Sequence, residues 1–177
     1  VSGGGMTVSG GEPLFQPEFT LELLKAVKER SIHTCMETCG FCDPEHLINA
    51  VPYTDLFLFD LKTAADVHWR WTGVPLEPIL SNLHTLDSAG GRIILRCPLI
   101  PGVNMNDHHM ENIIRTAASL KNLVELNLEP YHPVGISKCE ATGRKPEYVE
   151  PKMLGRGEAE KWAEKLRGRA RVPVKVV

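Results

Sequence analysis

Five residues near the start of the chain, Ser9 to Pro13, have side chains and spacing that suit a ligand-binding turn. Gly10 and Gly11 let the backbone close tightly around a ligand, and Glu12 offers an acceptor to an ammonium group. The same five residues also suit an ordinary turn, because Gly and Pro punctuate turns in most proteins. A functional role for this turn therefore depends on what the rest of the chain places beside it.

Polar and charged side chains also stand at the ends of apolar stretches that we predict to be strands. In the stretch 54–62, Asp60 and Lys62 share one face with two leucines, whereas Leu61 shares the other face with two phenylalanines. Parallel α/β folds build their sites at the carboxyl ends of strands. Any one such charge has a simpler explanation as a surface charge, but together they favour a site. The groups are Ser9 with Glu12, Glu37 with Thr38, Asp60 with Lys62, Arg96, and Tyr131 with His132.

The hydrophobic periodicity predicts strands and helices in alternation, which is typical of a parallel sheet with crossover helices. No internal repeat, low-complexity segment or linker marks a second domain, so we expect one domain over 1–177. The expected strands are 5–9, 32–38, 54–61, 92–97, 123–129 and 171–176. The expected helices are 18–30, 44–50, 64–71, 76–89, 107–121 and 156–168.

Composition narrows the classes of partner. The chain has 177 residues, 42% hydrophobic and 24% charged, with a formal net charge of −2. This balance gives no electrostatic case for a nucleic-acid or membrane partner, and no apolar stretch is long enough to span a bilayer. Five cysteines, an odd number, favour reduced thiols and a cytoplasmic location. The start at Val1, inside a Gly-rich stretch, predicts that the chain is a fragment.

Six segments in a fixed order carry a resemblance to a known family. The sequence resembles the radical S-adenosylmethionine superfamily, specifically the activating enzymes of glycyl radical enzymes, such as pyruvate formate-lyase-activating enzyme. The segments are Gly-Gly-Gly-Met-Thr-Val-Ser-Gly-Gly-Glu-Pro-Leu-Phe-Gln (3–16), His-Thr-Cys-Met-Glu-Thr-Cys-Gly (33–40), Phe-Asp-Leu-Lys (59–62), His68 with Thr72-Gly73, Arg96 with 98–104, and Pro130-Tyr131-His132.

The resemblance implies an α/β fold, an incomplete (β/α) barrel of mostly parallel strands with outer helices and with the first strand missing. It implies S-adenosylmethionine as the cofactor. Gly10, Gly11 and Glu12 would then hold its amino group, and Ser9 would support the turn. Without the first strand, the strand at 5–9 becomes an exposed edge through which the chain could self-associate.

The resemblance also assigns roles to the other strand ends. Glu37 and Asp60 would line the methionine end of the ligand, where a monovalent cation could lie between them. Lys62, Arg96 and His132 would face its carboxylate, ribose or adenine. His132 has a second interpretation as a structural histidine that donates to a backbone carbonyl. The segment 135–143 resembles a family loop with Lys138 near the site, although Cys139 stands where an aromatic residue is usual.

The chemistry of the family requires a [4Fe-4S] cluster held by a Cys-x3-Cys-x2-Cys loop. One electron, delivered by flavodoxin or ferredoxin, cleaves S-adenosylmethionine to a 5′-deoxyadenosyl radical. This radical takes hydrogen from a glycine of the partner, a glycyl radical enzyme similar to pyruvate formate-lyase. In the family the cluster loop precedes the Gly-Gly-Glu-Pro turn. We therefore expect the cluster only in the full-length parent, and expect this fragment to be inactive; any residual S-adenosylmethionine binding should be weak.

Cys35, Cys39 and Cys42 nevertheless have the cluster spacing, and we interpret this match as a decoy. The segment corresponds to a later strand of the family rather than to its first loop. In an extended strand Cys35 and Cys39 lie about 13 Å apart, at ~3.3 Å per residue, which is too far to share one cluster. Structural zinc with His33 as fourth ligand, or a true cluster, are the alternatives.

Two other functions compete with the family interpretation. A Schiff-base lyase also places a lysine at the end of a barrel strand, and Lys62 could serve if a desolvated pocket lowered its pKa. Asp60 nearby argues against this, because it should keep the lysine charged. The second competitor is a non-catalytic module that retains only a partner-binding surface.

Overall fold

Six strands alternate with helices along the chain. The structure is a computed structural model that describes residues 4–133, 143, 148 and 152–177. The strands are β1 (Gly5–Val8), β2 (His33–Thr38), β3 (Leu56–Asp60), β4 (Ile93–Leu99), β5 (Leu123–Pro130) and β6 (Val174–Val176). The α-helices are α1 (Pro17–Lys28), α2 (Pro44–Ala50), α3 (Ala65–Thr72), α4 (Glu77–Ser88), α5 (Asp107–Ser119) and α7 (Arg156–Arg167).

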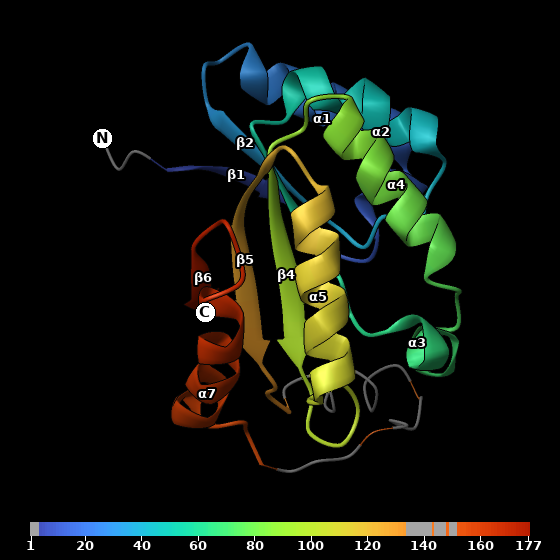
Figure 1. Cartoon of the computed structure of the whole chain (residues 1–177). Coiled ribbons are helices and arrows are strands. Elements are labelled where there is room, and N and C mark those ends of the chain that lie inside the picture. The colour runs from blue at the N-terminus through green and yellow to red at the C-terminus, as the bar shows by residue number, and fades with distance from the viewer. Residues whose placement is uncertain (1–3, 134–142, 144–147, 149–151) are drawn as a thin grey trace.

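All strand pairs in the sheet are parallel, and the strands follow one another in sequence order from β1 to β6. No pairing joins β6 to β1 among the described residues, so the sheet stays open. The arrowheads of β4 and β5 point toward the end of the molecule where α3 lies (Figure 1). The expected incomplete barrel of parallel strands with outer helices is confirmed.

One face of the sheet is packed against helices and the other is more open. In β3, Phe57 and Phe59 are fully buried, whereas Leu56, Leu58 and Asp60 are only partly buried. The alternation in β4 is the same, with Ile93, Leu95, Cys97 and Leu99 fully buried. Since side chains alternate between the two faces of a strand, the partly buried set shares the open face. The face that carries Asp60 is therefore the one on which a ligand has room.

The structure differs from the predicted elements mainly at their ends. Strand β4 continues to Leu99, two residues beyond the expected end, while β6 starts only at Val174. Two short 3-10 helices, Pro13–Phe15 and Val51–Tyr53, were not predicted. Each of them has a proline in its first turn. Proline suits this position because it has no N–H, and an N–H in the first turn finds no partner within the helix.

The loop between β2 and α2 is fixed by close packing at Gly40. Gly40 has a φ of +71°, and a Cβ at this position would lie 2.2 Å from the Phe59 ring. The side-chain Nδ2 of Asn82, on α4, donates hydrogen bonds to the carbonyl oxygens of Gly40 and Cys42, both at 2.8 Å. The strand end is thereby tied to a helix that comes much later in the chain.

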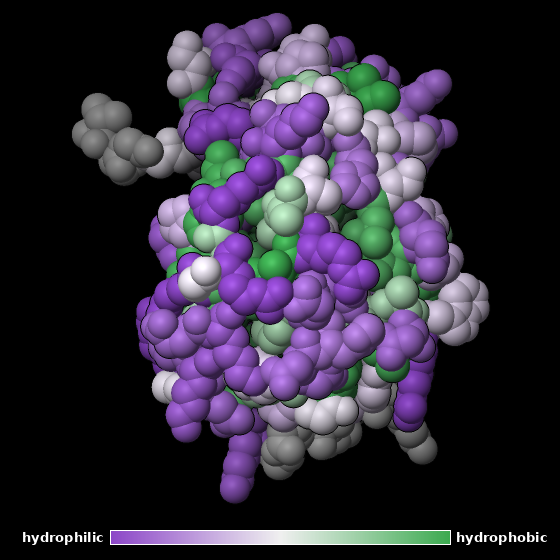
Figure 2. Space-filling view, viewed as in Figure 1, coloured by the Kyte–Doolittle hydropathy of each residue, from purple (hydrophilic) through white to green (hydrophobic). Residues whose placement is uncertain are grey.

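Figure 2 shows that hydrophilic side chains cover much of the face formed by the helices, with hydrophobic patches between them. In the part of the chain that the structure describes, no helix is both long enough and apolar enough to cross a membrane.

We predict that Gly40→Ala lowers the free energy of unfolding by about 2–4 kcal/mol. The positive φ costs about 1 kcal/mol for alanine, and the clash with Phe59 adds the cost of overpacking. Gly73→Ala is the matched control, because Gly73 has a φ of +77° but no atom within 4 Å of the position that a Cβ would occupy. Urea unfolding of both variants tests this, and equal losses would contradict the packing argument.

Candidate functional site

Arg96, on β4, lies among three carboxylates that come from three other strands. Its Nη1 lies 2.9 Å from Oε2 of Glu37 on β2, and its Nε lies 3.7 Å from Oδ1 of Asp60 on β3. Its Nε also donates to Oε1 of Glu129 on β5. Burial opposes the charge, but the hydrogen bond to Glu129 and the acidic neighbours raise the pKa of Arg96 further above its usual range. The guanidinium is therefore a permanent positive charge at the centre of the open face.

Asp60 and Lys62 complete this charged cluster on the same face of the sheet. Nζ of Lys62 lies 3.3 Å from Oδ2 of Asp60. Burial raises the pKa of Asp60 above its usual value, although Lys62 and Arg96 oppose the shift. Among the described residues, the buried Oδ1 of Asp60 has no hydrogen-bond partner. A buried acceptor of this kind is a place where a ligand group or a cation can bind.

Glu12 connects the glycine turn to the end of β2. Its Oε1 accepts from Oγ1 of Thr38 at 2.8 Å and from the backbone N–H of Leu14 at 3.3 Å. Its Oε2 accepts from the backbone N–H of Cys39 at 2.9 Å and from the Sγ–H at 3.1 Å. All four donors belong to the protein, so the carboxylate holds the turn in place. Its direct contact with a ligand stays a prediction.

The glycine turn itself is open to solvent. Ser9, Gly10 and Gly11 are exposed, and Gly10 has a φ of +107° that disfavours any side chain. No atom lies within 4 Å of the position that a Cβ of Gly10 or Gly11 would occupy. A ligand can therefore approach the backbone of this turn directly.

Two cavities lie along the carboxyl ends of the strands. The larger, of about 420 Å³, is lined by Asp60 and Lys62 and by the aromatic residues Phe15, Phe41 and Trp71, among others. The second, of about 330 Å³, is lined by residues of β4, β5 and the segment that follows, namely Arg96, Pro98, Ile100, Glu129, Pro130, Tyr131 and His132, together with Val177. Both cavities therefore adjoin the charged cluster.

The two histidines of the family segments have different surroundings. His132 is exposed and lines the second cavity, so a ligand can reach it. His68 is buried, its Nδ1 lying 2.8 Å from the carbonyl oxygen of Val74 and 3.0 Å from Oγ1 of Thr72. His68 thus stabilises the end of α3. Lys138 and Cys139 lie outside the described residues.

Asn104 fixes the backbone behind the site. Its side chain is fully buried, and its Nδ2 donates to the carbonyl oxygens of Lys62 and Pro98, both at 2.7 Å. Its Oδ1 accepts from the N–H of Ile100 at 2.7 Å. The ends of β3 and β4 are held at a fixed spacing by this one amide.

Glu129 is a site residue that the sequence analysis missed. It contacts Arg96 and lines the second cavity. The signal was present in the sequence, because Glu125, Asn127 and Glu129 alternate with other residues along β5. Three polar residues on one face of an otherwise apolar strand indicate that this face is not closed core.

The three cysteines with cluster spacing occupy unlike positions. Cys35 is buried within β2, opposite Thr7 of β1, as expected for a small core residue. Cys39 and Cys42 are partly buried in the loop that follows. Among the described residues, no group of three or more Cys, His, Asp or Glu side chains is arranged to hold a metal ion. The interpretation of this cysteine spacing as a decoy stays a prediction.

We predict that Arg96→Met lowers the free energy of unfolding at pH 8 by about 2–3 kcal/mol, because three carboxylates lose their shared cation. Burial raises the pKa of Asp60 and Arg96 opposes this shift, so removing Arg96 should raise the folded-state pKa of Asp60 further. The loss should therefore shrink as the pH falls through that raised value. Urea unfolding between pH 8 and pH 4 measures both effects.

The matched control for this prediction is Arg169→Met. Arg169 pairs with Glu111 at 2.7 Å, but both side chains are 50% exposed, so we expect less than about 1 kcal/mol at either pH. A loss of stability in Arg96→Met that did not change with pH would contradict the electrostatic account.

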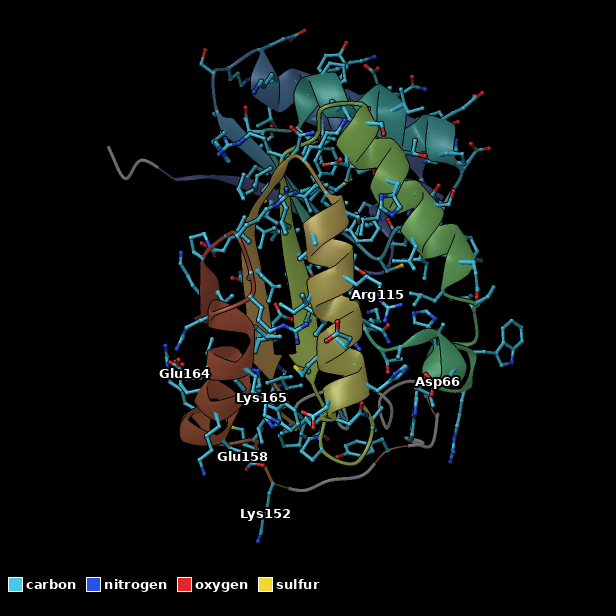
Figure 3. The ribbon with its side chains drawn as sticks, in the orientation of Figure 1. Asp66, Arg115, Lys152, Glu158, Glu164 and Lys165 are labelled. Atoms are coloured by element: carbon cyan, nitrogen blue, oxygen red, sulfur yellow. The ribbon has the colours of Figure 1, made fainter. Side chains whose placement is uncertain are left out.

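Other exposed charges, such as Glu164 and Lys165 on α7, lie far from this cluster in sequence and project from the helix (Figure 3).

Comparisons with known proteins identify the family of this chain. A model of the radical SAM superfamily matches residues 3–117. Choline trimethylamine-lyase activating enzyme of Oleidesulfovibrio alaskensis is 40% identical over 146 residues, which are 80% of this chain and 47% of that protein. (2S)-3-sulfopropanediol dehydratase activating enzyme of Klebsiella oxytoca is 43% identical over 148 residues, 80% of this chain and 46% of that protein. The chain thus spans about half the length of these relatives.

Solved structures share the fold. A domain of pyruvate-formate lyase-activating enzyme from Bacteroides vulgatus superposes with a TM-score of 0.80 and 27% identity, over 98% of this chain and 99% of that one. SuiB of Streptococcus suis bound to S-adenosylmethionine superposes with a TM-score of 0.66 at 12% identity, over 97% of this chain and 39% of that one. With its matching family model and its open parallel sheet, this chain belongs to the radical SAM superfamily.

Proposed function

We propose that this chain is the S-adenosylmethionine-binding part of an enzyme that activates a glycyl radical enzyme. The names of its relatives support the activation role, since the curated proteins named above are activating enzymes. The observation that carries the proposal is the charged cluster around Arg96, which lies at the carboxyl ends of four strands and beside a glycine turn with open backbone.

The residues present fit the charges of S-adenosylmethionine. The ligand carries an ammonium group, a carboxylate and a sulfonium, so it needs acceptors and a cation close together. The buried Oδ1 of Asp60 has no hydrogen-bond partner among the described residues, and Lys62 next to it can pair with the ligand carboxylate. Carbonyl groups of the turn at Gly10 and Gly11 can accept from the ammonium group. Arg96 forms ion pairs with both Glu37 and Asp60, so the two carboxylates are held close to one another.

The two cavities offer room for the rest of the ligand. The aromatic walls of the larger cavity suit an apolar or planar group beside Lys62. His132 and Tyr131 offer polar atoms at the edge of the second cavity, where ribose hydroxyls or an adenine could bind. These assignments keep the methionine end near Asp60 and the nucleoside end toward β4 and β5.

When bound, S-adenosylmethionine supplies the adenosyl group whose radical chemistry the superfamily is named for. The part that this chain contributes is to orient the ligand, to balance its charges and to hold the backbone that contacts it. The described residues do not supply a fitting set of cluster ligands, so we propose that the [4Fe-4S] cluster is held elsewhere in the full protein. We propose accordingly that this chain alone is inactive.

The partner and electron donor also belong to this proposal. We propose a glycyl radical enzyme as partner, of the pyruvate formate-lyase type or of the types that the relatives activate. Flavodoxin or ferredoxin would deliver the electron. A cytoplasmic location stays a prediction from the cysteine content.

The alternative of a Schiff-base lyase gains no support at the site. A lysine that forms a Schiff base needs apolar surroundings or a second cation beside it. Lys62 instead has Asp60 at 3.3 Å and is 45% exposed at its side chain. The surroundings suit an ion pair with a ligand carboxylate better than covalent catalysis.

Isothermal titration of the chain with S-adenosylmethionine tests the binding proposal. We predict saturable binding that Asp60→Asn weakens at least about tenfold. The substitution removes a charged acceptor for the ammonium group of the ligand or for a monovalent cation bound beside it. Asp66→Asn is the control, because Asp66 lies on α3 with 63% of its side chain exposed (Figure 3) and should leave the affinity unchanged. No binding, or equal weakening in both variants, would contradict the proposed site.

Anaerobic reconstitution with iron and sulfide tests the assignment of the cluster. We predict no stoichiometric iron and no [4Fe-4S] absorption from this chain, because Cys35 is part of a strand. Iron and sulfide assays with visible spectra measure this. A stoichiometric cluster that Cys39→Ala abolishes and Cys97→Ala leaves intact would overturn the decoy interpretation.

A further inference from the structure

The proposed function leaves one motif unused, the sequence Cys39-Gly40-Phe41-Cys42. Its two cysteines are separated by two residues in the loop between β2 and α2, and both are free and partly exposed. Cys39 also lines the larger cavity, as do Lys62 and Trp71, so a small molecule can approach this residue. This loop thus presents two accessible thiols next to the proposed ligand site.

The loop bends at Cys42 and is tied to α4 through two of its carbonyl groups. One amide nitrogen, Nδ2 of Asn82, lies 2.8 Å from the carbonyl oxygens of Gly40 and of Cys42. The positive φ of Gly40 turns the chain directly after Cys39. A disulfide needs the two Cα atoms within about 7 Å of each other, a distance that a bent chain can adopt over three residues.

The carboxylate of Glu12 lies beside Cys39 and also acts on Cys42. Burial raises the pKa of Cys42 to about 12, and the charges of Glu12, Cys39 and Asp43 add to the effect. Burial also raises the pKa of Cys39, as does the hydrogen bond from its Sγ to Glu12, while Lys62 opposes this. Both sulfurs therefore interact with the same carboxylate, and each is a thiol at neutral pH.

We propose that Cys39 and Cys42 form a redox-sensitive pair that closes to an intramolecular disulfide and thereby changes the turn at Gly10 and Gly11. The link is Glu12. In the reduced chain Cys39 Sγ–H donates to Oε2 of Glu12 at 3.1 Å. A sulfur in a disulfide carries no hydrogen, so Glu12 loses one of the donors that hold the turn against β2.

The oxidation balances with a peroxide as oxidant. One thiolate attacks hydrogen peroxide, its sulfur is oxidised to a sulfenic acid, and the peroxide O–O bond breaks with release of water. The second thiolate then attacks that sulfur, the S–S bond forms, and a second water leaves. Two protons and two electrons leave the thiols in total, and a dithiol reductant reverses the change.

Peptide mapping of the full 177-residue chain tests the disulfide. After treatment with hydrogen peroxide at pH 8.5 and blocking of free thiols, cleavage after Glu37 and after Phe41 places Cys35, Cys39 and Cys42 on three different peptides. We expect a reducible link between the peptides of Cys39 and Cys42. It should be absent in Cys42→Ser and unchanged in the matched control Cys35→Ser. The proposal would be overturned if no link formed, or if Cys39 or Cys42 were linked to another cysteine. It would also be overturned if the Cys42→Ser variant still lost two hydrogens on oxidation.

The rate of the reaction gives a second, independent test. Because the thiolate is the reacting form, the rate should rise about tenfold per pH unit between pH 7 and pH 9. Glu12→Gln removes the charge that both thiols face and should accelerate oxidation at pH 7.5, whereas Glu45→Gln, on the exposed start of α2, should not. A rate that is insensitive to pH and to Glu12 would overturn the assignment of these two thiols.

The effect on the turn rests on the proposed function and is measured separately. Titration with S-adenosylmethionine should show at least about threefold weaker binding to the oxidised than to the reduced chain, restored by reduction, and no such change in Cys42→Ser. If the disulfide forms and the affinity is equal, the coupling through Glu12 is wrong. If the disulfide forms but neither form binds, the proposed function fails and the redox pair stands.

Discussion

The guanidinium of Arg96 is the interaction on which the site depends. It brings together carboxylates from β2, β3 and β5, which would otherwise repel one another on the open face of the sheet. Three acidic groups and two cations, Arg96 and Lys62, leave one negative charge near the Oδ1 of Asp60, which has no hydrogen-bond partner among the described residues. A small ligand with both signs of charge can complete this arrangement, whereas an apolar ligand cannot. The open, parallel sheet is what allows four strands to contribute to one cluster.

Three polar side chains then fix the backbone around the cluster. Asn104 ties the end of β3 to the end of β4, Asn82 ties the loop after β2 to α4, and Glu12 ties the glycine turn to β2. Each bonds to buried or partly buried groups, so each spacing is specified by hydrogen bonds rather than by apolar contact alone. A binding site assembled from loops needs such supports, since its ligand contacts depend on spacing to within fractions of an ångström.

Much of this fold and site could be predicted from the sequence, for identifiable reasons. The alternation of Leu56, Leu58 and Asp60 with Phe57 and Phe59 distinguished the two faces of β3, and the glycine turn and Arg96 followed from strand ends. Glu129 was missed, because the polar residues expected at the end of β5 were Tyr131 and His132. The protein donors to Glu12 could not be foreseen either. Contacts across 26 or 27 residues depend on register and on loop conformation, neither of which is encoded in local periodicity.

We propose that a ligand with both signs of charge binds the open face, and membership of the radical SAM superfamily supports S-adenosylmethionine as that ligand. The most direct test is a crystal structure of this chain grown with S-adenosylmethionine. We expect the ligand at the strand ends, with its amino-acid group between the turn at Gly10 and Gly11 and the cluster of Asp60, Lys62 and Arg96. S-adenosylmethionine bound at another surface, with this cluster unchanged and free of ligand, would contradict the proposed site.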